Sequence, residues 1–326
     1  MSIERMIRLA GEREMPSADA MQRARAAAEE SWRRTLARVP VRSRRWQWWL
    51  PLACAAALGS LLLVFQPLAR KSDVLPLVVA QVAALQGDAT VQDVGGATKA
   101  LHGMAIHAGS SLVTEDGRVA AAIPGGLSLR LDRHTHLRFD DREHLTLLEG
   151  LVYVDSGGLN AGPTLSIRTP AGEVRHVGTQ FQVEVSGQTT RVRVREGRVA
   201  LVSVAEARAP AHAPLIAAGD ALEIRGTEQR WQHGRASFGP EWEWATTLAQ
   251  PLEIENRPLA EFLGWLAREH GWQLQYTSGA LQQRTHEIRL HGSFDGLDTT
   301  AMLERTTMVT GVPLAVRDGS LWVGVR

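Results

Sequence analysis

The stretch HVGTQFQVEV, residues 176–185, decides the fold class of the middle of this chain. Apolar and polar side chains alternate along it, which is typical of a β-strand whose two faces meet different surroundings. Gly178 interrupts the stretch, and a glycine inside a strand is typical of a β-bulge or of a close backbone approach. We therefore expect a structural role for Gly178, with Thr179 and Phe181 on one face and the two neighbouring glutamines on the other.

The same period of two extends in both directions from this stretch. Short alternating segments such as LSLRL (127–131) and VRVR (192–195) are separated by glycine and aspartate turns such as Glu115-Asp116-Gly117. Many short strands with regular turns are typical of an all-β domain. We predict such a domain over residues 76–225, with a solenoid-like or sandwich-like architecture.

An internal echo supports this prediction. Residues 147–152 resemble residues 194–199, so that Glu149-Gly150 aligns with Glu196-Gly197. We expect each copy to be a strand, a turn at the Glu-Gly pair and a second strand, because repeated units of this kind build stacked β architectures.

The pattern changes after a connector at residues 226–250 that contains Trp231, Trp242 and Trp244. Residues 251–326 predict a small α+β domain with two strand–helix–strand units, because a helical period of apolar residues appears twice between strand-like segments. Gly271 and Gly311 are expected to end the two helices. The expected elements are strands at 251–256, 272–276, 286–292, 313–316 and 321–325, a helix from Pro258 whose Leu259, Phe262 and Leu263 enter the core, and a helix at 298–310.

The N-terminal part has a different character. Residues 1–45 hold eleven arginines against six acidic residues, a net charge of +5, whereas the whole chain has a net charge of +1. The next 24 residues, 46–69, carry no charge and begin with three tryptophans among their first four residues. A helix of roughly 20 apolar residues crosses a bilayer, and tryptophan prefers its interface. We predict a single transmembrane helix at 46–69, rather than a cleaved signal peptide or a buried core helix.

Positive charge before this helix predicts a cytoplasmic N-terminus and an exported C-terminal part, which in a bacterium means a single-pass inner-membrane protein with a periplasmic region. Residues 1–45 favour a helical arm with Met21, Trp32 and Leu36 as its larger apolar side chains. We expect these three to contact a cytoplasmic partner, although a solvated arm without a partner is an equal alternative.

Catalytic signatures are not found in the sequence. There is no G-x-S-x-G, P-loop or H-E-x-x-H pattern, and the single cysteine, Cys54, lies inside the predicted membrane helix. The pair His134 and His136 fits a solvated strand surface better than a metal site. We therefore expect no enzyme, no cofactor and no metal, and the near-neutral charge of the whole chain gives no indication of a nucleic-acid partner. Trp322, on the last strand, is a candidate for partner binding, with packing into its own core as the alternative.

Residues 85–225 resemble the FecR family, the ferric-citrate regulator type of membrane-spanning anti-sigma protein. The motifs that carry the resemblance are Thr169-Pro170-Ala171-Gly172, then Val177-Gly178-Thr179-Gln180-Phe181, then Glu196-Gly197-Arg198-Val199. Residues 251–326 resemble the short N-terminal type of domain found in secretins and TonB-dependent transporters.

This resemblance implies a relay of signals across the inner membrane, with iron uptake as the usual setting. A TonB-dependent outer-membrane transporter would present its periplasmic signalling domain to residues 251–326, by strand addition to an edge of the module. An extracytoplasmic-function sigma factor would bind the arm at residues 1–45, and the membrane lipid would surround residues 46–69. The alternative is a membrane-anchored periplasmic scaffold or envelope-binding protein without a sigma-factor role.

Overall fold

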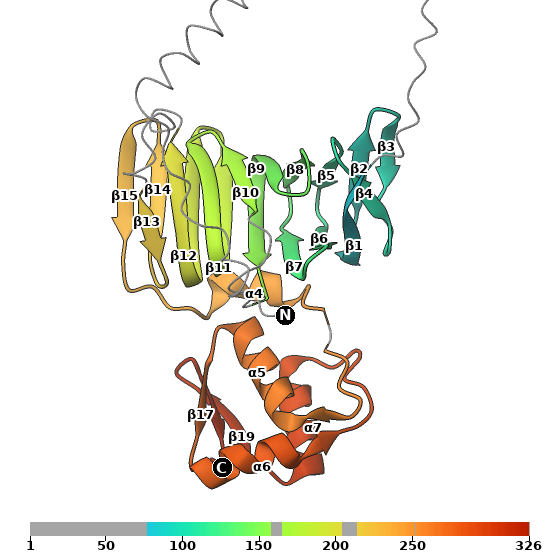
Figure 1. Cartoon of the computed structure of the whole chain (residues 1–326), viewed down its shortest axis with the longest axis vertical. Coiled ribbons are helices and arrows are strands. Elements are labelled where there is room, and N and C mark those ends of the chain that lie inside the picture. Colours follow the sequence, from blue (N-terminus) through green and yellow to red (C-terminus); the bar gives the residue numbers. More distant parts are fainter. Residues whose placement is uncertain (1–76, 158–164, 204–213, 251, 326) are drawn as a thin grey trace, which may run out of the picture. The chain divides into compact units, whose positions relative to one another are not determined.

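The computed structural model describes residues 77–157, 165–203, 214–250 and 252–325 (Figure 1). The predicted arm at 1–45 and the predicted membrane helix at 46–69 lie outside these residues. Within the described part of the chain, no helix combines the length and the apolar character needed to span a membrane.

Fifteen strands form one hydrogen-bonded β domain, as the alternating pattern predicted (Figure 1). Their pairings follow two rows. One row runs β15-β14-β12-β11-β9-β7-β6-β1-β4, and the other runs β3-β2-β5-β8-β9-β10-β11-β12-β13. The strands are β1 (Val78–Gln86), β2 (Ala89–Asp93), β3 (Gly96–Lys99), β4 (Ala105–His107), β5 (Ser111–Thr114), β6 (Arg118–Ile123), β7 (Leu127–Leu131), β8 (His136–Phe139), β9 (His144–Asp155), β10 (Ser166–Thr169), β11 (Gly172–Ser186), β12 (Thr189–Ser203), β13 (Leu215–Ala217), β14 (Ala221–Arg225) and β15 (Glu228–Gln232).

Three long strands, β9, β11 and β12, belong to both rows. Each pairs with one set of neighbours in its first half and with another set in its second half. The buried side chains of both rows join in a single hydrophobic core. The arrangement is therefore sandwich-like, with the long strands passing from one row to the other.

The Glu-Gly pairs lie where two of these strands bend. The expected turns at Glu149-Gly150 and Glu196-Gly197 are wrong, because β9 and β12 continue without a break through them. Gly150 and Gly197 have φ angles of 96° and 78°, which favour glycine. A side chain on Gly197 would also meet the carbonyl oxygen of Gly178 at 2.5 Å. The echo in the sequence therefore marks two bends within strands.

The structure confirms the expected bulge at Gly178. The ladder between β11 and β12 is regular up to the pair Val177–Arg198, and the next pair is Gln180–Glu196, so Gly178 and Thr179 face a single residue, Gly197. A second register shift follows before the pair Phe181–Val194. Gly178 has a φ angle of 56°, and Thr179 and Phe181 are fully buried. The bulge re-aims the residues that follow it, as bulges commonly do.

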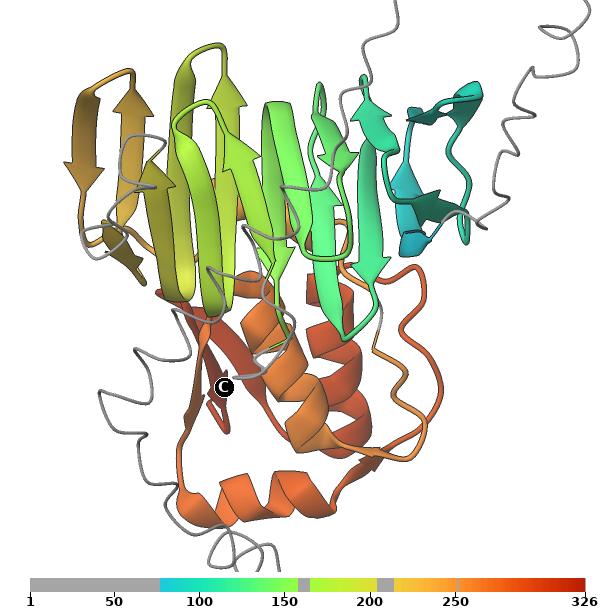
Figure 2. The same ribbon diagram turned by 45° about the horizontal axis from the view of Figure 1, so that its top comes forward.

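The C-terminal module contains the two predicted strand–helix–strand units, β16–α5–β17 and β18–α7–β19, followed by β20 (Figure 2). Strands β17, β20 and β19 form one small sheet in that order, and β16 pairs with β18 in another. Leu259, Phe262 and Leu263 are fully buried in its core, as predicted. The elements are β16 (Arg257–Pro258), α5 (Leu259–His270), β17 (Gln273–Tyr276), α6 (Gly279–Glu287), β18 (Arg289–Leu290), α7 (Thr299–Thr310), β19 (Leu314–Arg317) and β20 (Ser320–Val323).

Two expectations for this module are wrong. Residues 252–256 form no strand, and α6 occupies the start of the predicted strand at 286–292. Helix α6 begins at the N-cap Ser278, whose side chain accepts a hydrogen bond from the Leu281 backbone, and only Thr285 of the helix is buried. A polar helix of this kind has no apolar face for the sequence pattern to reveal. The helix ends at Gly271 and Gly311 are as predicted, each in the left-handed conformation.

The connector between the two cores also has regular structure. Its first part is β15, which extends the β domain, and helix α4 (Pro240–Thr246) follows. Trp242 and Trp244 of α4 are buried, and they form a small third cluster with Tyr153 of β9. The tryptophans of α4 therefore pack inside the molecule, between the β domain and the module.

Candidate functional site

The β domain presents a patch of buried polar side chains on the outer face of one row of strands. Arg130 of β7 lies opposite Tyr153 of β9, and Tyr153 lies opposite Gln182 of β11. Two residues further along β9, Asp155 lies opposite Gln180 of β11. These five side chains are all at most 6% exposed. Polar groups at such depth need partners, and the connector and the C-terminal module supply them to Arg130, Asp155, Gln180 and Gln182.

Glu269 of α5 makes the most deeply buried contact. Arg130 donates to both carboxylate oxygens of Glu269, at 2.7 and 2.9 Å, and also to the Ala245 carbonyl oxygen at 2.9 Å. The two side chains are 3% and 10% exposed. A bidentate guanidinium–carboxylate pair fixes orientation as well as distance. Removing one member of such a buried pair typically costs about 3–5 kcal/mol, because the other charge is left uncompensated.

Arg268, the residue before Glu269 in α5, makes a second ion pair, in which the positive charge lies on the helix. Arg268 donates to Asp155 at 2.6 Å and also pairs with Glu196 of β12. The Arg268 carbonyl oxygen accepts a hydrogen bond from the Gln180 amide at 3.3 Å. Adjacent residues of one helix end therefore hold charges of opposite sign on the strands.

Arg195 of β12 is held mainly by aromatic rings. Its guanidinium lies 4.5 Å from the centroid of the Trp242 ring and 5.7 Å from that of Tyr153, and it donates to the Glu269 carbonyl oxygen at 3.0 Å. The Tyr153 and Trp242 rings meet edge to face at 6.3 Å. Cation–π contacts gain strength when the cation is desolvated, which suits a side chain that is 6% exposed.

Electrostatics favours the charged state of both ion pairs. Burial opposes ionisation of Arg130, but the Glu269 carboxylate outweighs it and raises the pKa of Arg130 above its ordinary value. Burial likewise opposes ionisation of Asp155, but Arg268 outweighs it and lowers the pKa of that carboxyl. Arg195 has no carboxylate partner among the described residues, and burial lowers its pKa.

The end of α5 also fits closely against the connector. The Ser237 hydroxyl donates to the Gly271 carbonyl oxygen at 2.7 Å. A Cβ atom on Gly271 would lie 1.9 Å from the Ser237 carbonyl oxygen and 2.9 Å from Nε of Arg195. Gly271 therefore both ends the helix and allows this approach. We call docking contact the set of contacts that α4 and the end of α5 make with Arg130, Asp155, Gln180, Gln182, Arg195, Glu196 and Ser237.

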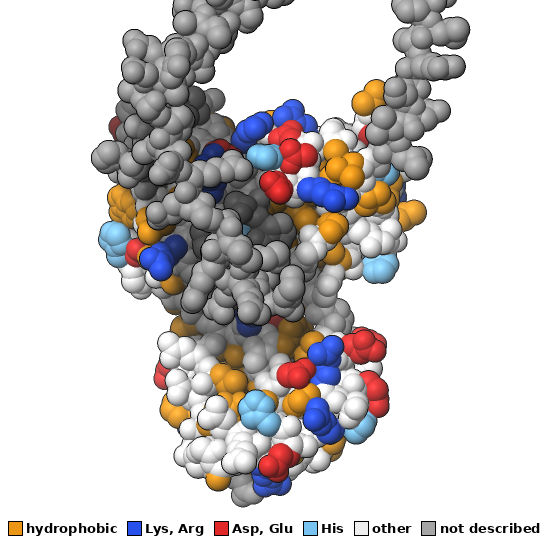
Figure 3. Space-filling model, viewed as in Figure 1, with side chains coloured by type: hydrophobic (Ala, Val, Ile, Leu, Met, Phe, Trp, Pro, Cys, Tyr) orange, Lys and Arg blue, Asp and Glu red, His pale blue; other side chains and the backbone are white. Residues whose placement is uncertain are grey.

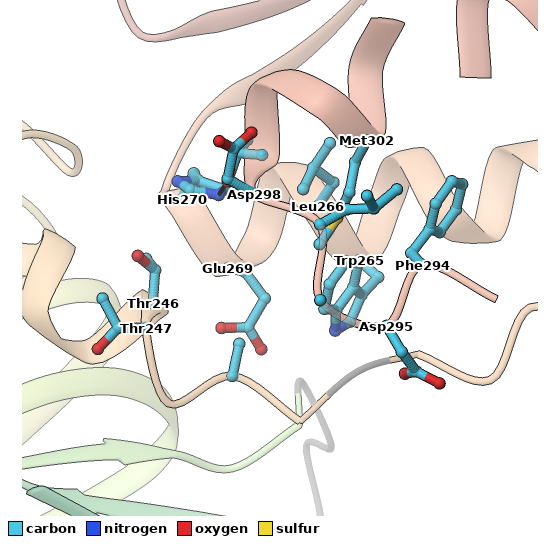
Figure 4. A pocket seen from close by; sticks show the side chains of 14 residues that line it. Thr246, Thr247, Trp265, Leu266, Glu269, His270, Phe294, Asp295, Asp298 and Met302 are labelled. Atoms are coloured by element: carbon cyan, nitrogen blue, oxygen red, sulfur yellow. Dashed lines mark hydrogen bonds between the residues drawn. The ribbon is translucent and has the colours of Figure 1, made fainter. Parts of the chain in front are cut away.

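A cavity of about 350 Å³ lies beside the docking contact. Figure 4 shows Trp265, Leu266 and Met302 in the middle of its lining, with Glu269, Asp295 and Asp298 around them. His270 also lines it. The His270 ring stacks on Trp272 at 4.2 Å and lies 3.0 Å from the Thr299 hydroxyl. Burial, and then the nearby positive charge of Arg195, lower the pKa of His270 to about 4.

Comparison with known proteins gives one family match. The family model described as FecR protein matches residues 110–200. Residues 110–200 therefore belong to a FecR domain. The match covers the Gly178 bulge and the bends at Gly150 and Gly197, which are the features that give the domain its shape.

Solved structures add little to this result. Two crystal structures of a proposed anti-sigma factor from Parabacteroides distasonis align with TM-scores of 0.34 and 0.33, each at 16% identity. They cover 65% and 66% of this chain and 96% and 97% of their own. The search of curated proteins found no match.

The predicted site residues fall into three groups. Met21, Trp32 and Leu36 lie outside the described residues. Trp322 is half-buried on β20, with Leu321 and Val323 buried on the opposite face of the sheet. Since β20 lies between β17 and β19, a partner strand would have to pair with β17 or β19. Gly178, Thr179, Phe181, Glu196 and Gly197 form the bulge and bend of the FecR domain, and Glu196 also pairs with Arg268.

Most of the docking contact was not predicted. Arg130, Arg195, Arg268 and Glu269 look like ordinary surface charges in the sequence, because their hydrogen-bond and ion-pair partners lie at least 72 residues away. One signal was present. The signal is the pair of glutamines in the HVGTQFQVEV stretch, Gln180 and Gln182. They form a polar face of the strand, and the structure buries this face as well as the apolar one. Gln182 donates to the Glu241 carbonyl oxygen of α4 at 2.9 Å.

Within the residues that the structure describes, no group of three or more His, Cys, Asp or Glu side chains is arranged to hold a metal ion. On the face of the molecule shown in Figure 3, Lys and Arg side chains lie among Asp and Glu side chains, and neither sign dominates. The docking contact joins the C-terminal module to the FecR domain, so a displacement of one would change the contacts of the other.

Proposed function

We propose that this protein regulates a sigma factor by binding it, as part of a signal relay across the bacterial inner membrane. The observation that carries the proposal is the FecR match at residues 110–200. A regulatory role on a sigma factor is the function that this match supports. The finer proposal is that the sigma factor is of the extracytoplasmic-function class and contacts the arm at residues 1–45.

The proposed orientation places the arm in the cytoplasm and residues 76–326 in the periplasm. Its support is the sequence: six arginines between Arg33 and Arg45 precede an uncharged segment of 24 residues. On the periplasmic side, the proposed input is the signalling domain of a TonB-dependent outer-membrane transporter bound to the C-terminal module. The open edges of β17 and β19 offer places for strand addition.

The docking contact is the proposed route between input and membrane. A partner that binds the C-terminal module would displace α5. Helix α5 carries Arg268 and Glu269, which form ion pairs with the FecR domain. A small displacement of α5 would break both hydrogen bonds of the Arg130–Glu269 pair at once. We therefore expect the module to be either docked or undocked, with few intermediate arrangements. The proposed mechanism is therefore binding and release, without a catalytic step.

The test expresses residues 1–45 alone in a strain that carries a reporter for the cognate sigma factor. We expect the arm to change reporter output relative to an empty vector. An arm with Met21→Ala, Trp32→Ala and Leu36→Ala should leave the output at the empty-vector level, because it keeps the charge and loses the apolar contacts.

The matched control for this test is an arm with Gln22→Ala and Arg25→Ala, which changes nearby polar residues only. It should act like the unaltered arm. If the unaltered arm has no effect, the sigma-factor role is refuted and the membrane-anchored scaffold becomes the better description.

A further inference from the structure

The cavity beside the docking contact has a composition of its own. Its lining comes from the end of α4, from α5, and from the start of α7 with the segment before it. Three of the lining side chains are carboxylates, namely Glu269, Asp295 and Asp298, and none is lysine or arginine. Figure 4 shows these carboxylates coming from different directions around the cavity. The cavity therefore has an excess of negative charge.

The three carboxylates are not equally engaged. Glu269 is paired with Arg130 on its other side. The side chain of Asp298 accepts a hydrogen bond from the Ala301 backbone as the N-cap of α7, and it has no ion pair among the described residues. Asp295 is exposed and likewise has no ion pair in the described part of the chain. Among the described residues, neither Asp295 nor Asp298 therefore has an ion-pair partner.

The middle of the cavity is apolar and partly aromatic. Trp265 and Phe294 line it, and both rings pack on Phe262 of the core, at 6.0 and 4.6 Å between centroids. Met302 and Leu266 complete the apolar part. Aromatic faces attract cations, and carboxylates at the rim strengthen that preference. A volume of about 350 Å³ lies within the usual range for small-ligand pockets.

We propose that this cavity binds a single positive charge carried on an apolar stem, as in an arginine side chain or an alkylguanidine. The stem would lie against Trp265 and Met302, and the charged group would meet the Asp295 carboxylate. The charge would also approach Glu269, where it competes with Arg130. Occupancy of the cavity therefore weakens the docking contact, which gives the contact a ligand-controlled release.

The experiment titrates the full-length chain in detergent with acetyl-leucyl-arginine amide and follows binding by isothermal titration calorimetry. The neutral isostere, acetyl-leucyl-citrulline amide, has nearly the same shape without the charge. We expect the arginine peptide to bind at least about tenfold tighter, since about 1.4 kcal/mol of charge interaction is a factor of ten. Equal binding of the two peptides would overturn the proposal.

Two variants locate the binding. Asp295→Asn removes an exposed charge that has no ion pair among the described residues, so the fold is preserved, and it should weaken binding several-fold. Met302→Trp should fill the cavity and abolish binding. The control is Glu304→Gln, an exposed carboxylate on α7, the helix that carries Met302, that does not line this cavity. Binding unchanged by Asp295→Asn, or weakened as much by Glu304→Gln, places the cation elsewhere and refutes the site.

A third probe identifies the source of the cation. Butylguanidinium carries the same charge and stem without a peptide backbone. Tighter binding of the peptide assigns the cavity to a basic side chain of a protein partner, whereas equal or tighter binding of butylguanidinium assigns it to a small organic cation. Both results support the cation site. None of these measurements depends on a sigma factor, so this proposal can fail while the proposed function stands.

Discussion

Single glycines decide where the long strands of the FecR domain turn. Gly178, Gly150 and Gly197 all have positive φ angles, and two of them lie in Glu-Gly pairs. At Gly197 the constraint is double, because the left-handed backbone disfavours any side chain and the carbonyl oxygen of Gly178 occupies the space where one would lie. The strongest family motif is thus a backbone requirement.

Replacing Gly197 with alanine should destabilise the FecR domain strongly. Its Cβ would lie 2.5 Å from the Gly178 oxygen and 2.6 Å from Cγ2 of Thr179, so the bulge must move. We expect a loss of about 3 kcal/mol or more in the free energy of unfolding, measured by urea denaturation.

The matched control is Gly187→Ala, because Gly187 has a φ angle of 56° and no atom within 4 Å of its added Cβ. This control isolates the backbone cost, about 1–2 kcal/mol. Equal losses for the two variants would show that the close approach at the bulge contributes nothing.

Among the helices, α5 has the clearest double role. Its apolar face, with Leu259, Phe262 and Leu263, forms the core of the module, and Arg268 and Glu269 near its end dock onto the FecR domain. The apolar face could be predicted because its spacing is local in the sequence. The docking end could not, because nothing within the helix distinguishes Arg268 and Glu269 from solvated charges.

A substitution at the end of α5 should undo the docking while sparing the module. Gly271→Ala places a Cβ 1.9 Å from the Ser237 carbonyl oxygen, so the helix end must withdraw from the connector. We expect faster amide hydrogen exchange in residues 236–246, which the docking contact covers.

Gly311→Ala provides the comparison at the end of α7. Gly311 has nearly the same backbone conformation as Gly271, with φ angles of 67° and 68°, and nothing lies within 4 Å of its added Cβ. Residues 236–246 should exchange at the original rate in this variant. Matching exchange rates in the two variants would mean that the close approach of Gly271 does not hold the connector.

Across the whole described region, two large hydrophobic cores are joined by a small aromatic cluster and a set of charges. The β domain and the two helix ends at Gly271 and Gly311 could be predicted from periodicity and glycine positions. Helix α6 and the docking contact could not, since the first lacks an apolar face and the second joins residues far apart in the chain. Long-range polar contacts leave no periodic trace in a single sequence.

Acid should loosen this assembly through His270. Its pKa in the folded protein is about 4, below the ordinary value of 6.5, so the unfolded chain binds the proton first as the pH falls. The contribution of neutral His270 to stability is therefore present above pH 6.5 and is lost between pH 6.5 and about 4. We expect the melting temperature to fall over this interval.

His270→Gln should flatten that fall, because glutamine does not titrate. The exposed His286, replaced in the same way, should leave the slope unchanged. An identical slope in His270→Gln and the original protein would exclude this histidine as the group responsible. Asp155, whose pKa is also lowered, should add a further loss only at more acidic pH.

The order of the two charged residues at the end of α5 has one more consequence. Arg268 faces Asp155, and the next residue, Glu269, faces Arg130. A module turned around by half a revolution would set arginine against arginine and glutamate against aspartate, two repulsions in place of two attractions. The two adjacent charges therefore favour a single orientation of the module on the β domain and disfavour the reversed one.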